Sequence, residues 1–213
     1  MKSELRWCED IGMFALDRPI PTSCLHKTEF CDKKCFNVKL YRLYPNMEKK
    51  DIRNEAYWKQ LTGKALKATL DRRTLQTDRV RFMTRGEAIR DYSDLDRVED
   101  ICEYNPDREF WLPTRAWRDA LLMARIESQL RPIRNLHVLA SMDPSNPAVD
   151  WETVRAFGWS TMFFGDDKML TTPLGEKMFK CPKTWGKVKG ACGTCKRGCF
   201  EGHGRVNVHL QGH

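Results

Sequence analysis

Residues 109–142 read EFWLPTRAWRDALLMARIESQLRPIRNLHVLASM, and this stretch decides the fold. Its two ends, Glu109 to Thr114 and Leu136 to Met142, have the length and apolar content of strands. The second is nearly continuous, as in a strand covered on both faces. Between them, apolar side chains recur at the spacing of one helix face: Trp117, Ala120, Leu121 and Ala124. The stretch therefore predicts a strand, a helix and a second strand.

The same alternation continues on both sides of this stretch. Apolar runs predict further strands at Gly12 to Leu16, Val80 to Thr84 and Ser160 to Phe164. Helices are predicted over Asn54 to Leu70, over a segment capped by Ser93 that carries Leu95, Val98 and Cys102, and over Asp150 to Phe157. Strands that alternate with helices lie parallel and are joined by right-handed crossovers. Because about five strands are too few for the eight of a closed barrel, we expect an α/β fold, a partial and open parallel β/α barrel.

The domain organisation follows from the absence of internal repeats and linkers. A chain of 213 residues suits one hydrophobic core. We expect a barrel-like unit over residues 1–176, with a cysteine loop near its start, and a basic, cysteine-rich tail over residues 177–213.

Polar residues follow the predicted strands at the edge where the carboxyl ends of parallel strands meet. In such sheets this edge binds ligands. The segments expected there are the loop from Cys24 to Cys35, Arg85-Gly86-Glu87, Arg115, Asp143 and Gly165-Asp166-Asp167.

The nine cysteines indicate metal binding rather than disulfides. The sequence contains no apolar run of about 18 residues and no apolar signal segment. We therefore expect a cytoplasmic protein without a membrane partner. In that reducing compartment, closely spaced cysteines are typical of metal sites.

Four tail cysteines, Cys181, Cys192, Cys195 and Cys199, form the densest group. The two-residue gap between Cys192 and Cys195 allows both thiolates to face one metal centre. Zinc sites usually use two separated C-x2-C pairs, whereas a compact run with one distant cysteine is closer to cluster-binding patterns. We expect an iron–sulfur cluster, with 4Fe-4S favoured and zinc as the alternative.

Three loop cysteines, Cys24, Cys31 and Cys35, form a second group, with His26 close by. They could hold a second cluster with one iron left open, or share a fourth ligand from elsewhere in the chain. The alternative is that one or two of them pack in the core, as free cysteines often do. Cys8 and Cys102 are expected to pack.

Positive charge is concentrated around the tail cysteines. From Lys177 onward the chain has eight basic residues and one acidic residue, Glu201. This excess could attract nucleic acid or compensate the negative charge of a thiolate-bound metal.

The segment Phe82-Met83-Thr84-Arg85-Gly86-Glu87-Ala88, with the cysteine loop after the first strand, resembles radical S-adenosylmethionine enzymes. In those enzymes the corresponding turn contacts the amino group of the cofactor, so the resemblance implies a similar core and cofactor contacts at Gly86 and Glu87. The family motif is C-x3-C-x2-C. Here Val38 stands at its third position and Arg85 replaces the first glycine of the turn, which argues against S-adenosylmethionine binding and radical chemistry.

A larger part of the chain resembles the bacteriophage gene-product-88 family, whose function is largely unknown. The resemblance rests on Cys35-Phe36, the Thr84 to Leu95 turn, FWLPTR at 110–115, Cys181-Pro182, the Cys192-Gly193-x-Cys195 knuckle and Val206-Asn207-Val208. It implies a phage origin and a metal-binding cysteine set.

Two functions remain open at this point. The first is an iron–sulfur protein with a redox or cofactor-dependent role, working with a redox partner or host protein in the host cytoplasm. The second is a zinc-stabilised, non-catalytic module that binds nucleic acid or a host protein through its basic tail. The sequence indicates neither a reaction nor an oligomeric state.

Overall fold

The computed structural model describes residues 5–73, 77–165, 168–186, 188–189, 191–196, 199–200 and 205–211. The side chains of Pro21 and Ala191 are also outside this description. Asp166 and Asp167, predicted at the edge of the sheet, lie outside the described residues.

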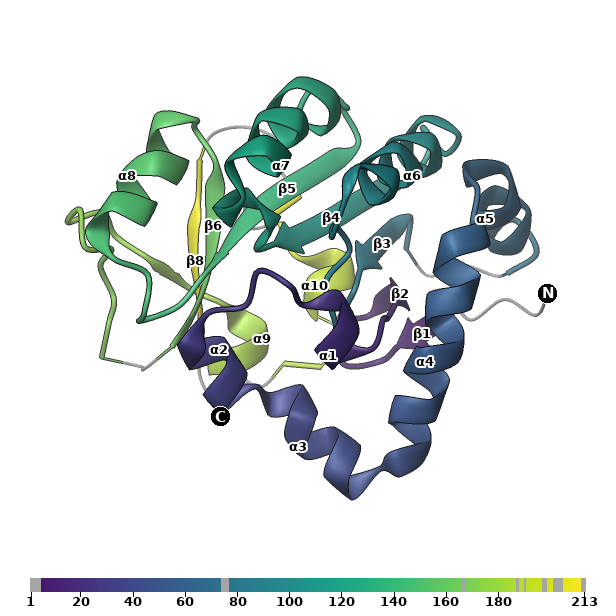
Figure 1. Cartoon of the computed structure of the whole chain (residues 1–213), viewed down its shortest axis with the longest axis horizontal. Helices are drawn as coiled ribbons and strands as arrows, with labels where there is room; N and C mark the ends of the chain where they lie inside the picture. The colour runs from purple at the N-terminus through teal and green to yellow at the C-terminus, as the bar shows by residue number, and fades with distance from the viewer. Residues whose placement is uncertain are drawn as a thin grey trace.

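The described residues form an eight-stranded sheet in the order β1-β2-β3-β4-β5-β6-β8-β7 (Figure 1). Its strands are β1 Arg6–Cys8, β2 Met13–Leu16, β3 Arg79–Phe82, β4 Glu109–Thr114, β5 Leu136–Met142, β6 Ser160–Gly165, β7 Phe179–Lys180 and β8 Asn207–Gln211. The β1–β2 pair is antiparallel and the other neighbouring pairs are parallel.

Short and medium helices connect the strands. They are α1 Ile20–Ser23, α2 Glu29–Lys34, α3 Phe36–Leu43, α4 Pro45–Gln60, α5 Gly63–Leu70, α6 Tyr92–Glu103, η1 Ala116–Arg118, α7 Ala120–Arg125, the π-helix η2 Ile126–Leu130, α8 Ala148–Ala156, α9 Pro182–Trp185 and α10 Ala191–Thr194. None of the helices in these described segments is long and apolar enough to cross a membrane.

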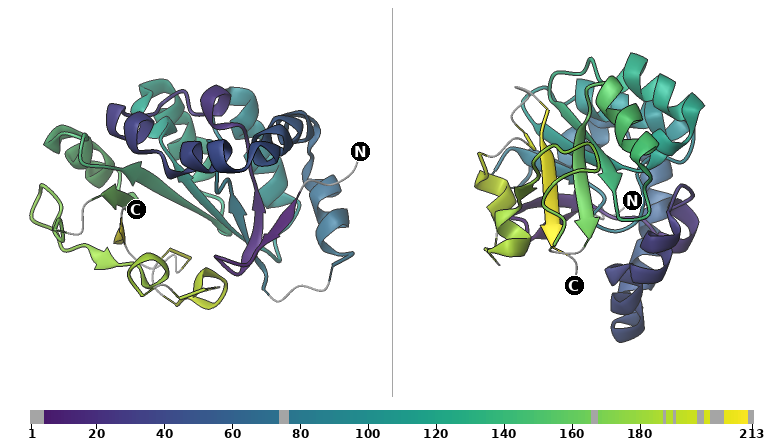
Figure 2. Two further views of the ribbon diagram at one scale, coloured as in Figure 1. Left: turned by 90° about the horizontal axis from the view of Figure 1, so that it is seen from below. Right: turned by 90° about the vertical axis from the view of Figure 1, so that its left-hand side faces the viewer.

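The two faces of the sheet have different covers. The helices α6, α7 and α8, which follow β3, β4 and β5, lie on one face, and α9 and α10 of the tail lie on the other (Figure 2). Side chains alternate accordingly along β4. Phe110 and Leu112 belong to the large apolar core, whereas Trp111 packs in a smaller cluster with Met162 and Phe200. The tail residues therefore cover the sheet face that the helices leave free.

The sequence predictions of the fold are largely confirmed. The sheet is open, mostly parallel and not closed into a barrel, and the predicted strands 109–114 and 136–142 are observed with the same bounds. The tail contributes β7 and β8 to this sheet, two strands that were not predicted.

Two local helix predictions were wrong. The predicted helix Asn54 to Leu70 is interrupted after Gln60, because the side chain of Thr62 accepts a hydrogen bond from Ala65 N and starts α5. The cap of α6 is Asp91 instead of Ser93, since the Asp91 carboxylate accepts from Asp94 N. In both cases another polar residue nearby satisfies the free N–H groups at the start of the helix.

Candidate metal sites

The four tail cysteines line one small cavity on the sheet face opposite α6 to α8. This tail cavity has a volume of about 30 Å³, and its other walls are apolar, including Trp111, Phe200 and Leu210. Cys192 and Cys199 also pack against the smaller apolar cluster around Trp111. The fold therefore gathers at one place the residues that the sequence predicts as primary ligands.

Contacts to the sheet hold the tail knuckle, residues 192–195, in position. Arg79 Nη1 donates hydrogen bonds to Cys192 O at 2.8 Å and Cys195 O at 2.7 Å, and its guanidinium lies 4.4 Å from the ring centroid of Phe200. Gly193 N donates to Ile11 O at 2.9 Å. A Cβ on Gly193 would lie 2.1 Å from Gly12 O, so a side chain here would collide with the turn between β1 and β2.

Burial raises the pKa of two of the tail thiols, Cys192 and Cys199. It raises the pKa of Cys192 to about 11, with the guanidinium of Arg81 opposing the increase. Burial also raises the pKa of Cys199, and the other three tail cysteines add to this effect. Buried thiols ionise when a bound cation compensates the charge, and a coordinating metal does this directly.

A buried polar atom in the wall of the tail cavity indicates which kind of group the cavity could bind. The indole N–H of Trp111 is buried, and no residue in the described part of the chain accepts a hydrogen bond from it. A buried donor without a partner is costly, and Trp111 lines the cavity together with the four cysteines. Sulfide or thiolate sulfur of a bound cluster would supply the missing acceptor, so these residues fit an iron–sulfur group.

Neither the described tail cysteines nor the loop cysteines are arranged to hold a single metal ion. Across the described segments, no three Cys, His, Asp or Glu side chains form a group that could hold one metal ion. A 4Fe-4S cluster is a different case, because its four cysteine thiolates bind a group of four irons and not one ion.

The three loop cysteines line a second and larger cavity at the carboxyl ends of β2 to β5. This loop cavity has a volume of about 160 Å³ and is also lined by His26, Gly86, Glu87 and Arg115. The predicted edge of the sheet thus brings the loop cysteines beside the predicted Gly86-Glu87 turn.

Hydrogen bonds from neighbouring strands position the cysteine loop. Thr28 caps α2 by accepting a hydrogen bond from Cys31 N at 3.0 Å, and its hydroxyl donates to the carboxylate of Asp143. Asp143 Oδ2 in turn forms an ion pair with Arg115 Nη2 at 2.8 Å. Arg115 and Asp143, both predicted at this edge, therefore lie against the loop.

Two of the three loop cysteines also have raised thiol pKa values. Burial raises the pKa of Cys24 to about 12, and the charges of Glu87, Cys31 and Cys35 add to this effect. Burial also raises the pKa of Cys31, although the positive charge of Arg115 opposes the shift. As in the tail, a bound metal would reverse this balance.

The Gly86-Glu87 turn is tightly packed. Gly86 has φ +78°, and a Cβ there would lie 2.5 Å from both Arg18 O and Ser23 Oγ. The carboxylate of Glu87 accepts hydrogen bonds from Ala88 N at 2.9 Å and Arg115 N at 2.8 Å, and burial raises its pKa. The carboxylate therefore already binds the protein's own backbone, although both residues line the cavity.

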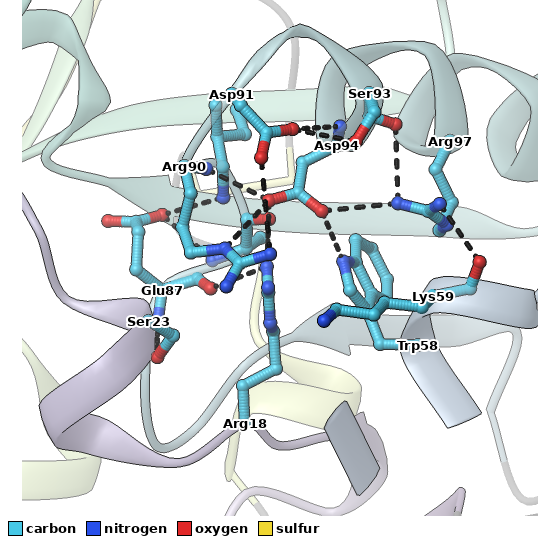
Figure 3. A network of polar contacts seen from close by, with 12 residues as sticks. Arg18, Ser23, Trp58, Lys59, Glu87, Arg90, Asp91, Ser93, Asp94 and Arg97 are labelled. Carbon is cyan, nitrogen blue, oxygen red and sulfur yellow. Dashed lines mark hydrogen bonds and ion pairs between the residues drawn. The ribbon is translucent and has the colours of Figure 1, made fainter. Parts of the chain in front are cut away.

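A buried polar network supports this turn from behind (Figure 3). The fully buried Arg18 donates to Ala88 O at 2.8 Å and to Asp94 Oδ2 at 2.9 Å. Its other nitrogens donate to the carboxylate of Glu55 at 2.7 and 2.9 Å. Asp94 also accepts from Trp58 Nε1 at 2.7 Å.

Asp17 anchors the start of the same turn. It is buried, and its Oδ1 accepts from Thr84 N at 2.9 Å and Arg85 N at 3.0 Å. Its Oδ2 pairs with Arg6 at 2.7 Å and Arg85 at 2.9 Å. Sequence reasoning missed Asp17 and Arg18; the available signal was a charged pair directly after a buried strand.

Met83 adds strain at the wall of the loop cavity. It is a non-glycine residue with φ +52°, a left-handed conformation that is uncommon for a long side chain. Such strain costs about 1–3 kcal/mol and clusters at binding sites, and Met83 lines the cavity.

Arg81 connects the two cavities. Its half-buried side chain lines the loop cavity, and its guanidinium lies 4.5 Å from the ring centroid of Trp111, which lines the tail cavity. Burial lowers the pKa of Arg81, while Cys192 and Cys199 favour its charged form. The two sets of cysteines are therefore neighbours across one layer of β3 and β4 side chains.

The other cysteines and His137 are not among the residues that line either cavity, although the ring centroid of His137 lies 5.6 Å from that of Phe200 in the wall of the tail cavity. Cys8 and Cys102 are buried in the apolar clusters, as predicted. His137 pairs with Glu109 at 2.5 Å on β4.

Comparison with known proteins gave one match. Searches of curated proteins and of solved structures found nothing similar, and no comparison supports the likeness to radical S-adenosylmethionine enzymes. A family model described as gene product 88 matches residues 10–202, about nine-tenths of the chain. The match covers the loop cysteines, the Gly86-Glu87 turn and the tail cysteines, and the chain therefore belongs to the gene product 88 family.

Proposed function

We propose that this protein is a bacteriophage iron–sulfur protein with a redox role in the host cytoplasm. In this proposal the tail cysteines hold one 4Fe-4S cluster, and the loop cysteines hold a second cluster that faces the loop cavity. A redox partner or host protein would exchange electrons with this protein.

The observation that carries this proposal is the convergence of seven cysteines from the two ends of the chain. They line two cavities on either side of Arg81 and Trp111. Scattered free thiols would have no reason to gather in this way, whereas cluster ligands must.

The chain's own residues would give the two sites different properties. The apolar walls of the tail cavity exclude water. Arg79 holds the knuckle by donating to its carbonyl oxygens, whereas the buried indole N–H of Trp111 could donate to a bound cluster. The loop cavity is larger and has the polar side chains of Asn37 and Arg115 in its wall. When bound, the clusters would supply one-electron chemistry. The larger loop cavity would be the place where a small partner molecule approaches a cluster.

Anaerobic purification with iron, zinc and sulfide analysis tests the proposal. We expect a brown protein whose visible absorption dithionite bleaches. Cys192→Ser and Cys31→Ser should each remove the iron of one cluster, and Cys102→Ser, in the apolar core, is the matched control. A colourless protein with stoichiometric zinc would contradict the proposal.

A second candidate is the zinc-stabilised module that binds nucleic acid. It is favoured by the exposed lysines around the tail cysteines, Lys177, Lys180, Lys189 and Lys196. If this function holds, binding to DNA or RNA should weaken steeply as the salt concentration rises. Binding that is insensitive to salt would argue against it.

A further inference from the structure

His26 has an imidazole nitrogen that its surroundings do not explain. Nε2 is shielded from solvent, and within the described segments it has no hydrogen-bond partner. Buried polar atoms of side chains are almost always paired, so the unpaired Nε2 indicates that a ligand binds there.

The backbone around His26 is held in place. Arg118 Nη1 donates hydrogen bonds to His26 O at 3.0 Å and Lys27 O at 3.1 Å. These two bonds fix the backbone of a residue that lines the loop cavity.

His26 lines the loop cavity together with Cys24, Cys31 and Cys35. A cubane cluster has four irons and takes four protein ligands, and the loop supplies three cysteines. Among the described residues that line this cavity, Glu87 is the other metal-binding side chain, and its carboxylate already accepts backbone hydrogen bonds. His26 is therefore the available fourth ligand.

We infer that His26 Nε2 is the fourth ligand of the loop cluster, giving it three cysteines and one histidine. The inference rests on the proposed function. His26 would coordinate the iron that three cysteines alone leave open. The loop cluster would then exchange electrons and would not bind a substrate at iron. A histidine ligand is also neutral, which leaves the cluster less negative than four thiolates would.

The test is pulsed electron paramagnetic resonance of the reduced, full-length protein with 15N-labelled histidine. We expect a strong coupling to histidine nitrogen. His26→Cys should keep the iron content and lose the coupling, whereas the control His137→Ala, on β5 and away from the loop cavity, should keep both.

Cyanide provides an independent readout, because it binds an iron with an open position. The signal of the native loop cluster should not change on addition of cyanide, whereas that of His26→Ala should change.

Two negative results are distinguishable. If Cys31→Ser removes cluster iron but the native protein shows no histidine coupling and reacts with cyanide, the inference is wrong and the proposed function stands. If Cys31→Ser removes no iron, the loop cluster itself is absent, and the inference falls with that part of the proposed function.

Discussion

At the scale of single residues, Gly193 shows how the tail depends on close backbone packing. Gly193→Ala should displace the knuckle, because its Cβ would meet the Gly12 carbonyl at 2.1 Å. Overpacking of this kind typically costs about 1–3 kcal/mol. We expect reduced stability in urea and loss of the tail metal, measured by metal analysis.

The matched control for this prediction is Thr194→Ala, at the exposed neighbouring position. It should change neither property. Full metal content in Gly193→Ala would show that the knuckle binds metal without its contact to the β1–β2 turn.

Asp17 gives a second prediction at this scale, concerning pH. Burial opposes ionisation of Asp17, but Arg6 and Arg85 outweigh it, so the pKa of Asp17 in the folded protein is lowered. Its charged form therefore stabilises the fold above the unfolded-state pKa, and this contribution is lost as the pH falls through the lower, folded-state pKa. Asp17→Asn should cost up to about 3–5 kcal/mol near neutral pH, because it removes the partner of the partly buried Arg6 and one of the two carboxylates that pair with the buried Arg85.

Urea unfolding at neutral and acidic pH measures this effect. The deficit of Asp17→Asn relative to the native protein should shrink in acid, whereas the exposed Asp78→Asn should behave like the native protein throughout. An equal deficit at both pH values would contradict the role of the Asp17 charge.

At the scale of elements, the hydroxyl of Thr28 links the start of α2 to Asp143, the residue directly after β5. Thr28→Val keeps the shape of the side chain but removes the cap on Cys31 N and the hydrogen bond to Asp143. Loss of a cap costs about 0.5–2 kcal/mol, so we expect a modest loss of stability. The loop cysteines should also react faster with a thiol reagent in the apoprotein.

Thr22→Val, at an exposed site on α1, is the control. If the two variants react at the same rate, α2 is held by contacts other than Thr28.

Elements also differ in how well sequence reasoning placed them. The strands β4 and β5 were placed correctly because their apolar runs are long and bounded by polar residues. The strands β1 and β7 have three and two residues, too few for a periodic pattern, and β8 follows the cysteine-rich tail. The pairing of β8 with β6 depends on the tail folding back on the sheet.

At the scale of the whole molecule, the tail joins distant parts of the chain. It contacts the β1–β2 turn through Gly193, β3 through Arg79, and β6 through β8. Metal in the tail would therefore contribute to the stability of the entire fold, since a ligand that binds the native state stabilises it.

Metal removal tests this coupling. Chelation or oxidative loss of the metal should lower the thermal midpoint of the native protein in a single cooperative transition. Cys192→Ser, which already lacks the tail metal in our proposal, should start lower and change less. An unchanged midpoint after complete metal loss would show that the tail folds without metal.

The sequence by itself determined the open α/β sheet, the five central strands and the grouping of the cysteines. These features depend on residues close together in the chain, where periodicity and spacing express backbone geometry directly. The tertiary structure decided which face the tail covers, that Asp17 and Arg18 hold the Gly86 turn, and that Arg81 and Trp111 separate the two cavities. Those contacts join side chains far apart in sequence, and their formation depends on the packing of the whole sheet, which no local pattern encodes.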